Sequence, residues 1–250
     1  MQKYIYILKY LCMNESKVRG ILLFSKISSE NNLYLKFLTD KDEILTGLSF
    51  GGSTKKKKNI FQTGYLLNLL IKNKNKNLPN NISAELSAPY FHNIFDNKYK
   101  LHGLLAIISL LNISIIEGQK VNGLFKLTER IIDVLANENK WIINYFVYLF
   151  NLLKLIGYDI DYNTNTSNDY INLETLRFEN NNISKSIKFP HQLLNGQDKI
   201  NLNNAESFFK IFEIILQNHH LNNMNLNIPI NYLNFKKIIL EFLTKNEKYN

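Results

Sequence analysis

The sequence has a single cysteine, Cys12, and this scarcity excludes several kinds of site. One thiol can form neither an internal disulfide nor a zinc site made of several cysteines. So little cysteine fits a reducing compartment, and we expect a cytoplasmic protein. Because Met13 is a natural second start, we interpret residues 1–12, which include Cys12, as an N-terminal extension.

Long apolar segments are also missing. The longest, Leu104 to Ile116, is interrupted by Asn112 and falls short of the ~20 residues that a membrane-spanning helix needs. The apolar opening stretch lacks the small-residue cleavage pattern of a signal peptide. We therefore predict no membrane partner.

Catalytic and cofactor motifs are equally scarce. The Gly51–Lys55 stretch lacks the Gly-Lys-Ser/Thr order of a phosphate-binding loop. His219 and His220 have no third ligand at metal spacing, and Asp159 and Asp161 are most simply solvated acids beyond a helix. We predict a protein that is not an enzyme, with no catalytic residues, no metal and no cofactor.

What the sequence does have is positive charge concentrated at one end. Residues 1–82 carry fourteen Lys or Arg against five acidic residues, whereas residues 83–250 carry sixteen of each. A cationic region joined to a neutral one indicates a surface for a polyanion and a second region with another role. Nucleic acid is the first candidate.

The spacing of apolar residues divides the chain in the same way. Apolar residues recur about every second position over five short segments, which we expect to be strands: residues 18–26, 32–38, 43–50, 65–72 and 82–88. The spacing is helical over residues 100–114, 123–136, 140–156, 205–218 and 230–244. Five strands in about seventy residues suit a small OB-fold barrel, a fold that binds oligonucleotides on one face.

The predicted fold class is therefore α+β. A five-stranded OB-fold barrel, the nucleic-acid-binding domain, occupies residues 13–82, and an α-helical domain occupies residues 83–250. The helical pattern is lost between about 158 and 197, where we expect an irregular insertion or a small ribbon. Gly157 and Pro229 stand where a helix should end and the next should begin.

The candidate nucleic-acid contacts are cations of the predicted barrel. The sharpest is the run of four lysines that follows Gly51-Gly52-Ser53-Thr54, and the others lie on the strands and the next loop. The full set is Arg19, Lys26, Lys36, Lys41, Lys55, Lys56, Lys57, Lys58, Lys72, Lys74 and Lys76. A lysine run alone is as often a solvated surface as a binding site, but the charge asymmetry favours binding, with a strong salt dependence.

Three aromatic residues offer faces on which unpaired bases could stack: Tyr34, Phe37 and Phe50. Strand aromatics are more often part of the core. Alternation puts Tyr34 and Lys36 on one face of their strand and Phe37 on the other, so Tyr34 is the better stacking candidate.

The order of several short motifs is similar to that of the recombination mediator RecO family. They are Gly20-Ile21-Leu22-Leu23, residues 29–32, Phe37-Leu38-Thr39, Gly47, Gly51-Gly52-Ser53 with its lysines, Gln62-Thr63-Gly64, Glu85-Leu86, residues 145–161 and Phe189-Pro190. The resemblance runs from about Met13 to Thr244.

The resemblance implies a non-enzymatic DNA repair and recombination factor in the cytoplasm, at the nucleoid during repair. Such a protein binds single- and double-stranded DNA and anneals complementary strands. With RecR it helps to load RecA onto DNA coated with single-strand-binding protein. Its other implied partners are the acidic C-terminal tail of single-strand-binding protein and RecF.

The chain departs from the family pattern at three places, and one of them is the hairpin glycine, which is replaced near Glu43. Some members have a four-cysteine zinc site in the region that matches residues 162–186, where this chain has no cysteine. Many members begin the last helix with Lys-Ser-Arg, where this chain has Ile230-Asn231-Tyr232. If the acidic tail is bound here, Tyr232, Lys236 and Lys237 are the candidates.

Two alternatives stay open from the sequence. An OB-fold adaptor that binds structured RNA would have the same basic barrel. A nuclease has little support, because no cluster of acidic residues, histidines or cysteines is visible.

Overall fold

The computed structural model describes residues 14–73, 78–87, 92–160, 170–181, 185–191 and 200–247. The predicted extension, residues 1–12, lies outside the described residues, as do the candidate contacts Lys74 and Lys76 and the acid Asp161. The chain forms two compact units. One is Met1–Pro89 with Ile115–Lys120, and the other is Tyr90–Ser114 with Val121–Asn250.

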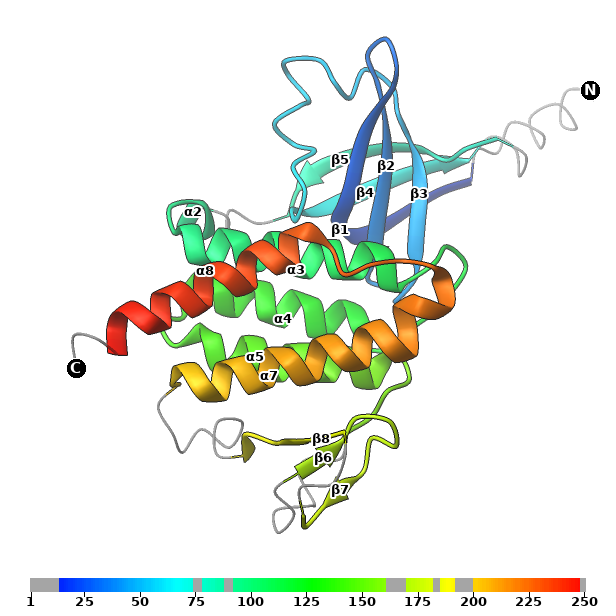
Figure 1. Cartoon of the computed structure of the whole chain (residues 1–250). Helices are drawn as coiled ribbons and strands as arrows, with labels where there is room; N and C mark the ends of the chain where they lie inside the picture. The colour runs from blue at the N-terminus through cyan, green and yellow to red at the C-terminus, as the bar shows by residue number, and fades with distance from the viewer. Residues whose placement is uncertain are drawn as a thin grey trace, which may run out of the picture. The chain divides into compact units, whose positions relative to one another are not determined.

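The first unit contains a closed barrel of five strands (Figure 1). They are β1 (Asn14–Ser29), β2 (Asn32–Thr39), β3 (Ile44–Ser49), β4 (Leu66–Asn73) and β5 (Asn81–Leu86). Their order around the barrel is β1-β2-β3-β5-β4, and β4 pairs back to β1 to close it. Pairing is antiparallel except between β3 and β5. The barrel confirms the predicted fold, and the predicted strand bounds differ from it by a few residues.

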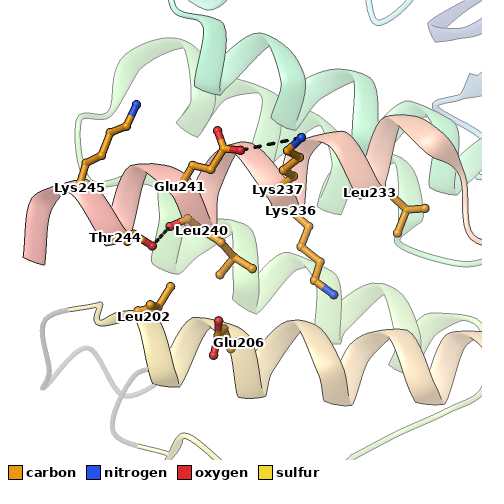
Figure 2. Close-up of a pocket in the computed structure, with 9 residues that line it drawn as sticks. All are labelled: Leu202, Glu206, Leu233, Lys236, Lys237, Leu240, Glu241, Thr244 and Lys245. Atoms are coloured by element: carbon orange, nitrogen blue, oxygen red, sulfur yellow. Dashed lines mark hydrogen bonds and ion pairs between the residues drawn. The ribbon is translucent and has the colours of Figure 1, made fainter.

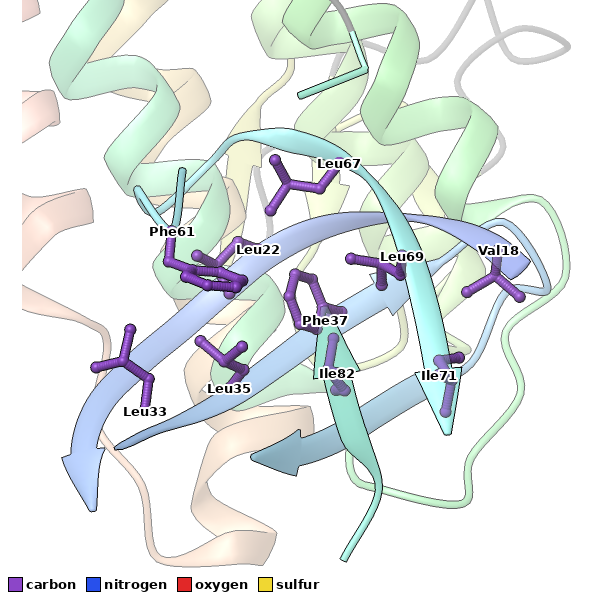
Figure 3. Packing of buried hydrophobic residues seen from close by; sticks show 10 residues of the cluster. All are labelled: Val18, Leu22, Leu33, Leu35, Phe37, Phe61, Leu67, Leu69, Ile71 and Ile82. Atoms are coloured by element: carbon purple, nitrogen blue, oxygen red, sulfur yellow. The ribbon is translucent and has the colours of Figure 1, made fainter. Parts of the chain in front are cut away.

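Alternation of apolar and polar residues forms the barrel core. Along β2, Leu33, Leu35 and Phe37 point inward and are buried, while Tyr34 and Lys36 between them point outward. The buried cluster consists of Val18, Leu22, Leu33, Leu35, Phe37, Phe61, Leu67, Leu69, Ile71 and Ile82 (Figure 3). Phe61 comes from the connection between β3 and β4, so this long loop is anchored in the core.

The second unit is built mainly from helices (Figure 1), and aromatic side chains pack together in its core. The helices in its described residues are α2 (His92–Phe95), α3 (Lys98–Ser114), α4 (Leu124–Asn137), α5 (Trp141–Leu155), α7 (Leu202–Ile215) and α8 (Ile230–Glu247). α3 packs against α8, and α4 packs against α5. The rings of Tyr145 and Phe235 lie 4.4 Å apart, and those of Phe146 and Phe208 lie 4.1 Å apart. None of the described helices is both long and apolar enough to cross a membrane.

The helix ends follow the predicted signals, with one difference. Gly157 has φ 105° after α5, and the Tyr158 amide donates to the Leu153 carbonyl at 2.8 Å, the pattern of a glycine-terminated helix. α7 does not end near residue 218 as predicted. It passes into a π-helical turn, η1 (Leu216–Leu221), and then into the 3-10 turn η2 (Asn222–Met224).

The region between α5 and α7 contains a small ribbon in its described part. Strands β6 (Tyr170–Asn172), β7 (Phe178–Glu179) and β8 (Ser186–Lys188) form a sheet in the order β7-β6-β8. Phe189 follows β8 and is buried against Phe150 of α5, with ring centroids 5.5 Å apart. This agrees with the expected irregular insertion.

Candidate nucleic-acid interface

The outer face of β1 and β2 carries aromatic and basic side chains side by side. Lys26 lies directly opposite Tyr34, and Phe24 lies opposite Lys36. The rings of Phe24 and Tyr34 meet edge to face with their centroids 6.5 Å apart. Phe24 is 38% exposed and Tyr34 is 37% exposed, so both rings leave surface for a ligand.

β3 continues this face. Leu48 lies opposite Tyr34 and Thr46 opposite Lys36, and both are only partly buried. Phe50 follows β3 directly and is 55% exposed. The other stacking candidate, Phe37, is fully buried in the barrel core, so it has no role at the surface. We refer to Phe24, Lys26, Tyr34, Lys36, Thr46 and Leu48 as the barrel face.

The four consecutive lysines, Lys55–Lys58, lie on the connection between β3 and β4 and are all exposed. This connection begins beside the β1–β2 turn, because the amide of Ser53 donates to the Asn31 carbonyl at 3.1 Å and that of Gly51 to the Asn32 side chain at 3.1 Å. The Lys57 ammonium donates to the Phe50 carbonyl at 3.2 Å. The lysine run therefore lies at the end of the barrel where Lys26 and Tyr34 also lie.

Other predicted contacts lie elsewhere on the barrel. Arg19 and Lys72 point outward on the β1–β4 side, where Arg19 faces Asp40 at 3.9 Å and Lys72 pairs with Glu15 at 2.6 Å. Lys41 is in the β2–β3 turn, at the opposite end of these strands from the lysine run. The described candidates thus divide into a compact set, Lys26, Tyr34, Lys36 and Lys55–Lys58, and three dispersed cations.

A short segment from outside the barrel strands covers one end of the barrel face. Ile115–Lys120 belongs to the barrel unit, although it lies between α3 and α4 in the sequence. The Thr46 hydroxyl donates to the Glu117 carboxylate at 2.6 Å, and the Lys36 ammonium donates to the Ile115 carbonyl at 3.4 Å. Burial lowers the pKa of Lys36, and the nearby Glu117 carboxylate partly opposes this shift.

The helical unit has a groove of about 590 Å³ between α7 and α8 (Figure 2). Its lining combines apolar and charged side chains: Leu202, Glu206, Leu233, Lys236, Lys237, Leu240, Glu241, Thr244 and Lys245. Lys236 pairs with the partly buried Glu213 at 2.7 Å, whereas Lys237 is well exposed and 4.0 Å from Glu241. Lys237 and Lys245 therefore present the more accessible positive charge.

Tyr232 does not belong to this accessible surface. Its side chain is fully buried, next to Phe209 and Phe212, with ring centroids 6.1 and 5.4 Å away. Burial, followed by the effect of Glu213, raises the pKa of Tyr232 well above its usual value. Because α8 directs this ring into the core, Tyr232 cannot contact a partner directly, and the interpretation as a contact residue is corrected on this point.

The sequence interpretation missed Phe24, Thr46 and Leu48 of the barrel face, and it missed Glu117, which contacts this face. Phe24 could have been found, because alternation back from Lys26 places it on the same side of β1. The strand contains a register shift between Leu22 and Phe24, and Leu23 is buried, so the simple period fails there. Glu117 had no local signal, since its contact with Thr46 joins residues 71 positions apart.

A four-cysteine zinc site does not fit the ribbon. The Asn172 side chain donates to one Glu179 carboxylate oxygen at 3.0 Å, and the Ser186 hydroxyl donates to the other at 2.9 Å. The side chains of Asn172, Ser186 and Glu179 are thus hydrogen-bonded to one another, and none of them has a thiolate that could bind zinc. Among the residues that the structure describes, no three His, Cys, Asp or Glu side chains gather as a metal site would require.

The two adjacent histidines also have other partners. His219 Nε2 lies 2.9 Å from the Leu173 carbonyl, and His220 Nε2 lies 3.1 Å from the Ser114 carbonyl. Each ring thus connects the π-helical turn to a neighbouring segment of the helical unit. Burial lowers the pKa of His220, and its hydrogen bond to Ser114 partly opposes the shift.

Together, fold and surface define an OB-fold protein with a helical second unit and a basic, aromatic barrel face. Comparison with known proteins finds similarity to one family. The model for the C-terminal region of recombination protein O matches residues 99–169. The chain is 26% identical over 194 residues to the DNA repair protein RecO of two strains of Rickettsia bellii, covering 73% of this chain and 80% of each relative.

A third relative is the DNA repair protein RecO of Hyphomonas neptunium. It is 28% identical over 144 residues, which are 57% of this chain and 59% of the relative. The predicted resemblance to the RecO family is confirmed, at modest identity over most of the chain.

Proposed function

We propose that this protein acts in DNA repair and recombination as a mediator without catalytic activity. It binds single- and double-stranded DNA, anneals complementary strands and, with RecR, helps to load RecA onto DNA coated with single-strand-binding protein. The observation that carries the proposal is the exposed Phe24–Tyr34 pair with Lys26, at the end of the barrel where the four-lysine run lies. The RecO relatives support the same role.

The functions of the two domains are assigned from the charge distribution. We assign DNA binding to the barrel domain, residues 13–82, and partner binding to the helical domain, residues 83–250. Bases stack on Tyr34 and Phe24, and the lysines bind phosphates. The assignment to the cytoplasm belongs to the same proposal.

The α7–α8 groove is the proposed site for the acidic tail of single-strand-binding protein. Its apolar floor would accept the hydrophobic end of such a tail, and Lys237 and Lys245 would meet the acidic groups. Lys236 is already paired with Glu213, so it contributes less. RecR and RecF are further proposed partners, which the family resemblance alone supports.

The test of the DNA surface is charge reversal of Lys55–Lys58 to Glu. If each lysine contacts one phosphate of a single strand, the salt slope falls by about 0.7 per lysine, or about 2.8 in all. The wild-type protein should then lose roughly fifty-fold more affinity than the variant between 50 and 200 mM salt. Fluorescence anisotropy with a labelled oligothymidylate measures both affinities.

The matched control reverses four exposed lysines of the helical unit, Lys98, Lys126, Lys140 and Lys210, and so makes the same change in net charge. It should leave the slope close to that of the wild type. Equal slopes for the wild type and the Lys55–Lys58 variant would contradict the assigned surface. Preference of the wild type for folded RNA over unpaired DNA would favour an RNA-binding adaptor instead.

A further inference from the structure

The segment Ile115–Lys120 satisfies the donors of the barrel face that lie farthest from the lysine run. The two donors, Lys36 and Thr46, are opposite each other on β2 and β3, on the same surface as Tyr34. Both donate to acceptors of the segment, one a backbone carbonyl and the other the Glu117 carboxylate. An ammonium and a hydroxyl at neighbouring positions are also donors to the phosphate groups of nucleic acids.

We propose that Ile115–Lys120 is an intramolecular competitor of nucleic acid, in which the Glu117 carboxylate on Thr46 and the Ile115 carbonyl on Lys36 occupy the place of a phosphodiester. The proposal rests on the function proposed above and adds a means of regulating it. In the closed state only the Phe24, Lys26 and Tyr34 end of the face accepts a strand. When the exposed residues 116–120 move away and the buried Ile115 stays in place, Lys36 and Thr46 become two more contacts and the binding site lengthens.

The polar contacts that the segment makes with Lys36, Thr46 and Glu43 are weak enough to be exchanged, whereas the Ile115 side chain is buried and anchors the start of the segment. The Thr46–Glu117 hydrogen bond is exposed, and the Lys36–Ile115 bond is long at 3.4 Å. A third contact is a single bridge between Glu43 and Lys120. An exposed hydrogen bond or ion pair contributes about 1 kcal/mol or less, so a strand that offers new phosphate contacts can displace the segment.

Lys36 itself supports the exchange. Its ammonium is about half buried at present, and burial lowers its pKa, so the segment holds this cation in surroundings that disfavour its charge. The Glu117 carboxylate compensates in part. A phosphate has the same sign of charge as the carboxylate and accepts the same hydrogen bonds, so it can take over the compensating role.

The experiment compares wild type with Glu117→Gln and Glu117→Ala. The control is Glu85→Gln, which removes one negative charge from an exposed position of β5, on the Arg19 side of the barrel. Affinity for oligothymidylate is measured by anisotropy from 50 to 200 mM salt, and thermal unfolding is recorded for each variant. One more phosphate contact steepens the salt slope by about 0.7, which amounts to about 2.6-fold in affinity over this range.

We expect both Glu117 variants to bind more tightly than Glu85→Gln at low salt and to have the steeper slope. If they match the Glu85→Gln control while the wild type binds DNA, the competitor proposal is overturned and the proposed function stands. A lower melting temperature with an unchanged slope would mean that the segment is only a structural brace, which overturns it as well. If neither wild type nor variants bind DNA, both proposals fail.

Discussion

Tyr34 is a residue whose surroundings suit base stacking. Its ring is supported on one side by Phe24 and is 37% exposed, whereas the neighbouring residues of β2, Leu33 and Leu35, are buried. Tyr34→Ala should weaken binding of a single strand by about 1–3 kcal/mol, or roughly five- to 150-fold, because a stacked base loses its aromatic partner. Anisotropy with oligothymidylate at constant salt provides the measurement.

Tyr34→Phe is the matched control, since it keeps the ring and removes only the hydroxyl. It should bind within about twofold of the wild type if stacking is the main interaction. Wild-type affinity in Tyr34→Ala would show that the Phe24–Tyr34 pair is ordinary surface packing. Because Tyr34 points out of the barrel core, neither substitution should unfold the protein.

The sequence predicted Tyr34 but not Phe24 or Glu117, and the reason is physical. Alternation is a local property of a regular strand, and β2 is regular from Leu33 to Phe37. β1 is also regular from Phe24 to Lys26, so alternation back from Lys26 could have found Phe24, and the pattern fails only at the register shift between Leu22 and Phe24. The contact of Glu117 depends on how the chain returns to the barrel after α3, which no nearby residue specifies.

At the scale of elements, closure of the barrel depends on a close approach between β3 and β5. The two strands are parallel and are paired at Leu48 and Asn81. A Cβ atom added to Gly47 would lie 2.6 Å from the Asn80 carbonyl oxygen and 2.7 Å from a methyl of Ile82. Backbone cannot move away as a flexible side chain could, so this position requires glycine.

Gly47→Ala should therefore destabilise the barrel by about 1–3 kcal/mol, the usual cost of forcing extra volume into a packed site. Chemical denaturation followed by circular dichroism gives the free energy of unfolding. Ser83→Ala, at an exposed position of the adjoining strand β5, is the control and should change it by less than about 0.5 kcal/mol. If Gly47→Ala and Ser83→Ala had equal free energies of unfolding, β3 and β5 would be able to move apart for the added methyl group without loss of stability.

The elements were more predictable than their contacts. The bounds of the five strands and the main helices were predicted to within a few residues. Each element must bury one face, so its apolar residues recur every 2 positions in a strand and about every 3.6 positions in a helix. Tyr232 was assigned to the surface, yet the spacing of Tyr232, Phe235, Ile239 and Leu243 places all four on the buried side of α8. The π-helical turn after α7 had no counterpart in the pattern.

At the scale of the whole molecule, the proposal separates two activities that need different surfaces. On this proposal, annealing of naked strands requires only the barrel face and the lysine run. Strands coated with single-strand-binding protein also require recognition of the coat, which we assign to the α7–α8 groove. Substitutions in the two places should therefore have different consequences for annealing.

The double substitution Lys237→Gln and Lys245→Gln tests this separation. It removes two exposed positive charges from the groove and leaves the buried core of α8 unchanged. Each exposed charge pair contributes about 0.2–1 kcal/mol, so affinity for an acidic tail peptide should fall about two- to thirtyfold. Annealing of coated complementary strands should slow, while annealing of naked strands should keep the wild-type rate.

Lys210→Gln is the control for this prediction, because Lys210 is exposed on α7 but does not line the groove. It should anneal coated strands at the wild-type rate. Reversal of Lys55–Lys58 should slow both reactions, since both need the DNA surface. If the groove variant anneals coated strands as fast as the wild type, the coat is recognised elsewhere than in the α7–α8 groove.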